Sequence, residues 1–157
     1  MFIGYGRLRD WLDQQAARLP GRVAVVDAIP PGELLGYTVD ADIGFVGQPP
    51  RTLNQRLNLA NKWFEYLQAG VPVVVFEGTA HCALTREHDV GLCVDVEDRH
   101  AIPIAIARLL SEGPGERHER RVRARSVGSE RYTWEIQGPA VIELYRRLGS
   151  DGPRHAG

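Results

Sequence analysis

The spacing of short, unbroken apolar runs is the feature that most constrains how this chain can fold. The runs are Arg22–Val26, Asp42–Val46, Val71–Phe76 (VPVVVF, the strongest) and Gly91–Val94, and Phe2–Ile3 indicate the end of a further strand. Because polar residues do not alternate with apolar ones in these runs, they are typical of strands buried on both faces. We therefore expect a parallel sheet covered by helices.

Amphipathic stretches separate these runs. We expect helices over Arg7–Leu19, Asn61–Ala69, Asp98–Leu110 and Trp134–Leu148, and a polar, arginine-dense segment over Glu116–Arg131. Asp98 is expected to cap its helix, and Gly47–Leu59 is expected to be a long loop. Alternating strands and helices with short connections predict right-handed crossovers and a Rossmann-like three-layer α/β sandwich. We expect one domain over residues 1–148 and a disordered tail over residues 149–157, which has nothing to bury.

Composition excludes several classes of protein. The chain has 157 residues and a formal net charge of −1, so it has no general electrostatic attraction for nucleic acid. No run approaches the ~18 apolar residues of a membrane span, and Met1–Asp10 lacks the pattern of a secretory signal. Cys82 and Cys93 are too few for a disulfide framework, which favours free thiols and a cytoplasmic protein.

The turn Gly4-Tyr5-Gly6, between a strand and a helix, invites a dinucleotide-binding interpretation. The third glycine of that fingerprint is replaced by Arg9, and Asp27 is the only acidic residue near the end of the second predicted strand. We favour a tight strand-to-helix turn, because two-glycine matches are common.

Two further clusters have alternative interpretations. His81, Cys82, His88 and Cys93 match no common zinc spacing, so buried thiols and a surface histidine are favoured over a metal site. Arg117–Arg125 (RHERRVRAR) could contact phosphates or anionic lipid headgroups. Interleaved glutamates fit a solvated helix face equally well, and we favour that interpretation while leaving peripheral membrane contact open.

The segment Asn61–Val74 (NKWFEYLQAGVPVV) has the clearest functional pattern. A short helix begins where a long loop ends, and Gly-x-Pro leads from it into the strongest strand. The unpaired N–H groups and positive dipole of a helix start, together with Lys62, make a site for a diphosphate. Glu65, one turn in, can accept hydrogen bonds from two vicinal hydroxyls, as on a ribose. The alternative is that Lys62 is a surface cation and Glu65 only complements the dipole.

This segment resembles the nucleotide-sugar motif of retaining GT-B glycosyltransferases of the family 4 type. The similarity extends to Phe2–Leu12 (FIGYGRLRDWL), Val23–Leu35 (VAVVDAIPPGELL), Ala41–Val46 (ADIGFV) and Tyr132–Leu148, and so spans about residues 2–148. The resemblance implies the C-terminal, donor-binding half of a GT-B fold, truncated at its N-terminus so that the first strand and helix of that half are missing.

The resemblance also implies roles for particular residues. Glu65 would bind the ribose hydroxyls, and the base would lie near Ile29 and Pro31. The diphosphate would be held by Asn58, Leu59, Ala60, Asn61 and Lys62. The implied reaction is transfer of a hexosyl group from a nucleoside diphosphate sugar with retained configuration. The nucleotide sugar is the substrate, and neither a metal nor another cofactor is implied.

Departures from the family pattern limit these expectations. Leu57 stands where many members carry a second glutamate, eight residues before Glu65. The arginine and lysine that usually clamp the diphosphate, and the acceptor-binding domain, are absent from the sequence. We therefore assign no catalytic acid or base, and expect a fragment or subunit that is inactive alone and needs a missing N-terminal GT-B domain or a partner subunit. The alternative is a non-catalytic Rossmann-like interaction module that pairs with a partner subunit through its edge at Met1–Gly6.

Overall fold

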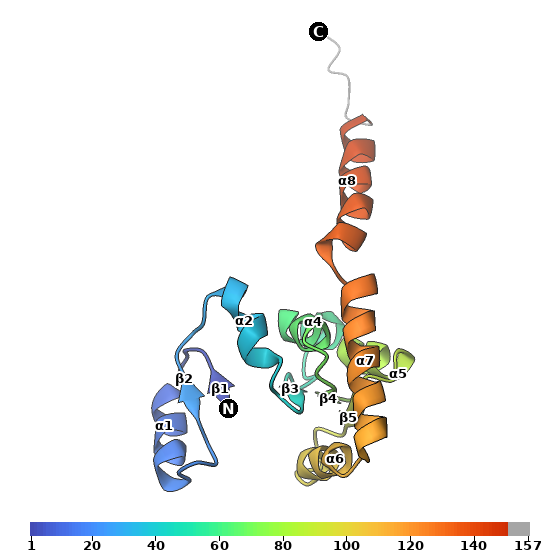
Figure 1. The fold of residues 1–157 in the computed structure, drawn as a ribbon. Helices are drawn as coiled ribbons and strands as arrows, with labels where there is room; N and C mark the ends of the chain where they lie inside the picture. Colours follow the sequence, from blue (N-terminus) through green and yellow to red (C-terminus); the bar gives the residue numbers. More distant parts are fainter. Residues whose placement is uncertain (151–157) are drawn as a thin grey trace. The chain divides into compact units, whose positions relative to one another are not determined.

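A computed structural model describes residues 1–150, with side chains described as far as Leu148. The chain divides into two compact units, one over Met1–Tyr37 and a second that begins at Thr38. The elements, labelled in Figure 1, follow one another as β1 (Phe2–Ile3), α1 (Arg9–Arg18), β2 (Val25–Val26), α2 (Pro31–Thr38), β3 (Gly44–Val46), α3 (Leu53–Leu57), α4 (Asn61–Gln68), β4 (Val73–Phe76), α5 (Ala80–Glu87), β5 (Gly91–Val94), α6 (Ala101–Leu110), α7 (Pro114–Arg131) and α8 (Trp134–Ser150).

Every strand pairs in parallel, as predicted. In the second unit β4 is the central strand of a sheet of order β3-β4-β5, in which Val75 lies opposite Val46 on one side and Cys93 on the other. In the first unit β1 and β2 form a separate two-stranded ladder. The predicted strand Gly91–Val94 is confirmed residue for residue, whereas the other predicted runs form shorter strands.

The core of the second unit shows why the β4 run is continuously apolar. Val73 and Val75 point into a cluster built with residues of α4, α5 and α7. Val74 and Phe76 point into a second cluster, formed mainly with α6. Both faces of the strand are therefore buried, and the helices lie in layers on either side of the sheet, as expected for a three-layer sandwich.

Two helices differ from the predictions because local capping decides them. The predicted loop Gly47–Leu59 contains α3, which starts with a capping box between Thr52 and Gln55. Helix α5 was not predicted, and the Thr79 side chain caps it by accepting the Cys82 N–H. The predicted start of a helix at Asp98 is too early: α6 begins with His100 as its N-cap residue, and the Asp98 carboxylate accepts the His100 N–H at 2.8 Å.

The two cysteines are not free thiols as predicted. Cys82 of α5 and Cys93 of β5 form a disulfide, with their Cα atoms 5.6 Å apart. The strand that follows α5 runs back beside it, so residues eleven positions apart become neighbours.

The first unit has no buried side chain. The apolar stripe predicted for α1 does not form a core there, and Trp11, for example, is 56% exposed. A unit of this size rarely buries enough apolar surface to be stable alone, since folds below ~40 residues usually need added support. The unit therefore presents apolar surface that further polypeptide could cover.

The predicted tail, residues 149–157, lies almost wholly outside the described residues, since α8 continues to Ser150 and residues 151–157 are not described. Among the described helices, none is long and apolar enough to cross a lipid bilayer.

The close pairing of β4 and β5 predicts a sharp effect of one methyl group. A Cβ at Gly91 would collide with the backbone of Val73, which cannot move without breaking the ladder between the strands. We expect Gly91→Ala to lower the free energy of unfolding by at least ~3 kcal/mol. Gly115→Ala is the matched control, because its Cβ meets nothing within 4 Å and alanine favours the helix by up to ~1 kcal/mol. Urea denaturation measures both, and equal stability of the two variants would contradict the packing.

Candidate functional site

The start of α4 lies at the edge of the sheet where the parallel strands end. The helix connects β3 to β4, and a helix in such a crossover runs antiparallel to its strands. Its N-terminus therefore lies at the carboxyl edge of the sheet, where open α/β folds usually bind ligands. The sequence argument places the diphosphate at this same point.

Trp63 anchors the first turn of α4 in the core. Its side chain is 0% exposed, and its ring lies edge-on to Phe64 and Tyr132, with centroids 5.1 and 5.4 Å away. The indole N–H donates to the Thr85 hydroxyl at 2.9 Å. The buried side of the helix is thereby fixed, while Asn61 and Lys62 on the same turn are exposed.

The polar groups at this helix start are not used by the protein. Ala60 is the N-cap residue and supplies no side-chain cap. Within residues 1–150, the N–H groups of Asn61 and Lys62 make no hydrogen bond. The Lys62 ammonium and the half-buried Glu65 carboxylate form no ion pair or hydrogen bond in this range either. Such a helix start can bind an anion without breaking an internal contact.

Asn58 and Leu59 complete the predicted diphosphate set on the loop before α4. The Oδ1 atom of Asn58 is buried and has no hydrogen-bond partner in the described structure. Leu59 lines an apolar cavity of about 330 Å³ together with Phe64 of α4 and Tyr132 and Trp134 at the junction of α7 and α8. The loop before α4 thus carries both an unpaired polar atom, on Asn58, and a residue that lines an apolar cavity, Leu59.

The remaining predicted site residues lie elsewhere. Ile29 and Pro31 belong to the first unit, Ile29 just before α2 and Pro31 as the first residue of that helix, a position that proline favours. The structure therefore brings together Asn58, Leu59, Ala60, Asn61, Lys62 and Glu65, all within the second unit. Leu57, where the family often has a glutamate, ends α3 and is 66% exposed.

The glycine turn of the first unit forms as a tight turn. Gly4 and Gly6 have φ angles of 134° and 157°, which side-chain-bearing residues rarely adopt. Arg9, at the position of the missing third glycine, holds the Asp27 carboxylate at 2.7 Å. An arginine paired with Asp27 stands where the fingerprint needs a glycine, which supports the tight-turn interpretation.

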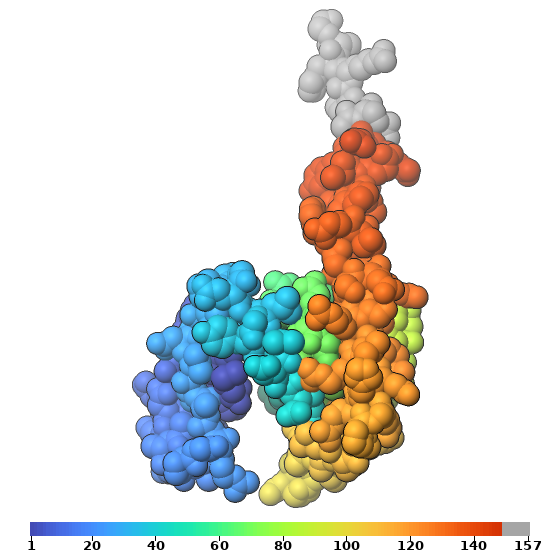
Figure 2. Space-filling view, in the orientation of Figure 1, coloured from blue at the N-terminus to red at the C-terminus, as the bar shows by residue number. Residues whose placement is uncertain are grey.

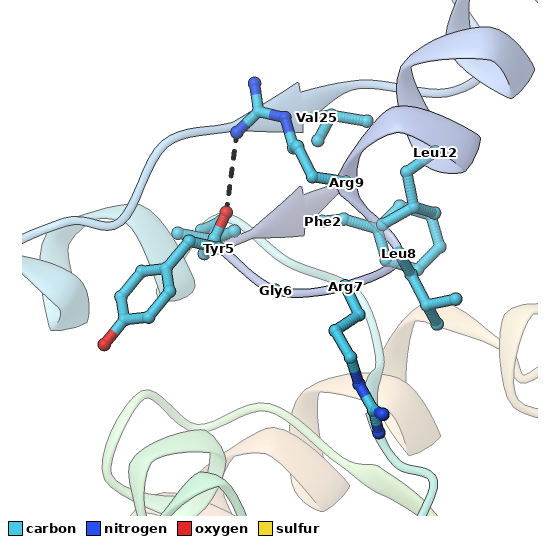
Figure 3. Close-up of a pocket in the computed structure, with 10 residues that line it drawn as sticks. Phe2, Tyr5, Gly6, Arg7, Leu8, Arg9, Leu12 and Val25 are labelled. Atoms are coloured by element: carbon cyan, nitrogen blue, oxygen red, sulfur yellow. Dashed lines mark hydrogen bonds between the residues drawn. The ribbon is translucent and has the colours of Figure 1, made fainter.

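A cavity of about 390 Å³ lies beside this turn, within the first unit. Figure 3 shows Phe2, Leu8, Leu12 and Val25 along it, with Arg9 hydrogen-bonded to the backbone of the turn. Arg7 and Arg9 also line it, but Arg9 is already paired with Asp13 and Asp27, so we do not treat this cavity as the nucleotide site.

The arginine-rich stretch of α7 serves internal contacts. Four of its guanidinium groups bind the protein itself. Arg117 donates to the Leu110 carbonyl oxygen, and Arg121 donates to those of Val39 and Ala41. Arg120 contacts Glu112 and Asp89, and Arg123 contacts Asp89. Hydrogen bonding to Glu112 raises the pKa of Arg120 above its ordinary value. The interpretation of these arginines as simply solvated is therefore wrong, because they tie α7 to neighbouring segments.

The predicted surface histidine is also wrong. His81 and His88 are both buried, and His88 Nε2 lies 2.8 Å from the Tyr132 hydroxyl. His81 Nε2 accepts the Ala60 N–H at 2.8 Å, a contact with the candidate site that sequence reasoning missed because no local pattern signals it. In the described part of the chain, no group of three or more His, Cys, Asp or Glu side chains is arranged to hold a metal ion.

Known proteins resemble this chain in fold, whereas no family is recognised from its sequence. No protein-family model matches the chain, and no curated protein matches it. Among solved structures, a sucrose-phosphate synthase from Thermosynechococcus elongatus matches with a TM-score of 0.71 and 24% identity over 92% of this chain and 34% of that one. WaaG, a glycosyltransferase involved in lipopolysaccharide biosynthesis, matches with a TM-score of 0.63 and 15% identity over 88% of this chain and 35% of its own.

A UDP-forming α,α-trehalose-phosphate synthase from Burkholderia vietnamiensis matches with a TM-score of 0.57 and 20% identity over 95% of this chain and 34% of that one. The chain thus spans about a third of the length of the solved chains it matches. The fold expectation is confirmed: this is a mixed α/β fold with parallel strands that matches the C-terminal half of GT-B glycosyltransferases. Identity at this level establishes the fold alone.

Because Arg120 forms buried internal contacts and Arg125 is exposed, their substitutions should affect stability differently. Arg120 and Glu112 form an ion pair at 2.7 Å with side chains only 11% and 9% exposed. We expect Arg120→Gln to lower the free energy of unfolding by ~3 kcal/mol, because it leaves Glu112 buried without a counter-charge. Arg125→Gln, on the exposed side of the same helix, should change it by less than ~0.5 kcal/mol. Denaturant titration compares the pair, and similar losses in both would argue against a buried clamp.

Proposed function

We propose that this chain is the donor-binding half of a retaining glycosyltransferase that uses a nucleoside diphosphate sugar. The observation that carries the proposal is the start of α4, where the N–H groups of Asn61 and Lys62 and the charges of Lys62 and Glu65 are all unpaired in the described structure. These groups occupy the carboxyl edge of a sheet in a fold shared with glycosyltransferases. The family 4 type is part of this proposal.

The chemistry of such a site concerns the leaving group. As the bond from the sugar to the diphosphate breaks, negative charge grows on the departing phosphate oxygens. Two N–H groups, the positive end of the α4 dipole and the Lys62 ammonium stabilise that charge without rearranging. Glu65 accepts hydrogen bonds from the two ribose hydroxyls and so fixes the nucleoside. Ile29 and Pro31 would approach the base, and no metal or other cofactor is required.

The unpartnered Asn58 amide supports the same assignment. A buried polar group without a partner costs ~1–3 kcal/mol, so a bound ligand that supplies the partner gains affinity. Oδ1 can accept from a sugar hydroxyl, and the opposite amide orientation would donate to a phosphate oxygen. Asn58 therefore lies ready for either part of a nucleotide sugar.

Further polypeptide is needed for transfer to an acceptor. The chain spans only about a third of the chains it matches, and α8 contacts little of the described chain besides α7. Figures 1 and 2 show α8 extending beyond the end of α7. Seven apolar side chains on it are at least 40% exposed: Trp134, Ile136, Val141, Ile142, Leu144, Tyr145 and Leu148. We infer that an N-terminal GT-B domain or a partner subunit covers this helix and brings the acceptor, so the chain alone should bind donor but not transfer it.

Calorimetric titration with UDP and GDP tests the donor site. We expect binding without turnover, and Glu65→Ala should weaken it ~10- to 100-fold through loss of charge-assisted hydrogen bonds. Lys62→Ala should weaken it several-fold, and Lys62→Arg should recover only part of the loss, because a planar guanidinium replaces a compact ammonium. Glu130→Ala, exposed on α7, is the control and should bind as the wild type does. No binding by the wild type, or no effect of Glu65→Ala, would refute the donor site.

The second candidate is a non-catalytic interaction module, and one observation favours it: no side chain of Met1–Tyr37 is buried, so that unit presents apolar surface. Sedimentation velocity separates the candidates. The donor-domain proposal predicts nucleotide binding and a sedimentation coefficient that Phe2→Lys leaves unchanged. A dimer that Phe2→Lys dissociates, in a chain that binds neither UDP nor GDP, would instead favour the interaction module.

A further inference from the structure

Helix α5 holds the start of α4 through two hydrogen bonds. His81 and Thr85 lie one turn apart on α5, and each meets the beginning of α4. The Ala60 N–H donates to His81 Nε2 at 2.8 Å, and the Trp63 indole N–H donates to Thr85 Oγ1 at 2.9 Å. The second bond fixes the buried side chain of α4, whereas the first fixes the backbone at which the helix begins.

The contact at Ala60 determines the protonation state of His81. A backbone N–H can only donate, so Nε2 must accept and must carry no proton. His81 is therefore neutral, with its proton on Nδ1. The side chain is 1% exposed, and burial lowers the pKa of His81 from its ordinary value of 6.5. Geometry and burial thus require the same neutral form.

No charged neighbour offsets that burial. The ionisable residues on or beside the elements around His81 are Lys62, Glu65 and Tyr66 on α4, Glu77 before α5, Arg86, Glu87, His88 and Asp89 on or just after α5, and Asp95 after β5. In the described structure none of them forms an ion pair or hydrogen bond with His81. Strands β4 and β5 carry no ionisable side chain. Whether Nε2 can accept the Ala60 N–H therefore depends only on whether His81 itself is protonated.

The histidine supplies what Ala60 lacks. The methyl side chain of Ala60 at the N-cap cannot accept a hydrogen bond from the backbone of its helix. His81 instead takes the Ala60 N–H from the buried side, which fixes the peptide between Leu59 and Ala60. Asn61 and Lys62 are exposed residues, and their N–H groups make no hydrogen bond in the part of the chain that the structure describes. A polar N-cap side chain would consume an N–H of this first turn, whereas the histidine orders the turn and leaves both available.

We propose that His81 is the positioning residue of the donor site: its neutral imidazole holds Asn58–Ala60 in the conformation that presents the Asn61 and Lys62 N–H groups to the diphosphate. This inference rests on the proposed function for its ligand, but the His81–Ala60 contact can be tested without one. His81 acts through Ala60 and touches neither donor nor acceptor in this account. Protonation at Nε2 would replace the acceptor with a donor and release the loop.

The direction of the pH effect follows from the lowered pKa. Below about 6.5 the unfolded chain takes up a proton on His81 that the folded chain resists. The stabilising contribution is therefore complete above that pH and is lost as the pH falls from about 6.5 toward the lower folded-state value. Donor affinity should decline over the same range as the protonated population grows.

The variants His81→Gln, His81→Phe and His88→Gln test the proposal. Glutamine can place its Oε1 near the position of Nε2 and accept the Ala60 N–H without titrating, whereas phenylalanine fills the space but accepts nothing. His88→Gln makes the same substitution at a buried histidine that contacts Tyr132 instead. Amide hydrogen exchange of Ala60, followed by NMR, is the readout that needs no nucleotide, and thermal melting of each variant reports on global stability.

We expect Ala60 to exchange at least ten-fold faster in His81→Phe than in the wild type, with wild-type protection in His81→Gln and His88→Gln. Affinity for UDP or GDP should follow the same order. On lowering the pH from 7 to 5, affinity should fall more in the wild type than in His81→Gln. That comparison is essential because phosphate groups themselves titrate near pH ~6.

Equal Ala60 exchange in wild type and His81→Phe would overturn the proposal, whatever the nucleotide results. If His81→Phe does not fold, equal pH profiles of wild type and His81→Gln would overturn it instead. The predicted exchange pattern without any UDP or GDP binding would overturn the proposed function, and with it the assignment of a donor to the loop that His81 holds.

Discussion

The burial of Trp63 is the interaction on which the candidate site depends. Its indole is enclosed by the rings of Phe64 and Tyr132, and its N–H is satisfied by Thr85. A large aromatic side chain held in this way orders the turn that carries it, because displacing it would expose the ring and leave a buried hydroxyl and an N–H unpaired. The buried side of α4 thus supports its polar start, while the Asn61 and Lys62 N–H groups make no hydrogen bond within residues 1–150.

The sheet supplies the second constraint, because it determines the direction in which α4 runs. The strongly apolar β4 can lie only between two layers, and α4 must return over it to connect it with β3. Gly70, with a φ of 68°, makes the short turn between helix and strand. The start of α4 is thereby carried to the carboxyl edge of the sheet, so the apolar pattern of one strand determines where the charged groups are presented.

Much of this arrangement was predictable from residue patterns. The unbroken runs identified the parallel strands, and the spacing of Trp63 and Leu67 identified α4, because periodic burial is a local signal. The helix start that carries Lys62 and Glu65 was predictable as well, and their role in a binding site stays a prediction. The Thr52–Gln55 pattern that begins α3 was present in the sequence as well, and could have divided the expected loop.

The missed features depend on contacts between distant residues. His81 could not be recognised as a partner of Ala60, since 21 positions separate them and nothing local distinguishes it from a surface histidine. Cys82 meets Cys93 only after α5 and β5 have packed. Arg121 resembles any solvated arginine until the chain brings the carbonyl groups of residues 39 and 41 within its reach.

The central claim is that the free N–H groups at the start of α4 bind the diphosphate of a nucleotide. The most direct measurement is the amide NMR spectrum of the chain during addition of UDP or GDP, with uridine and guanosine as controls. We expect the Asn61 and Lys62 amide signals to shift with a diphosphate and to stay in place with either nucleoside alone. If both signals remain unmoved at millimolar UDP and GDP, or move equally with the nucleosides, the start of α4 does not bind a diphosphate and the account is contradicted.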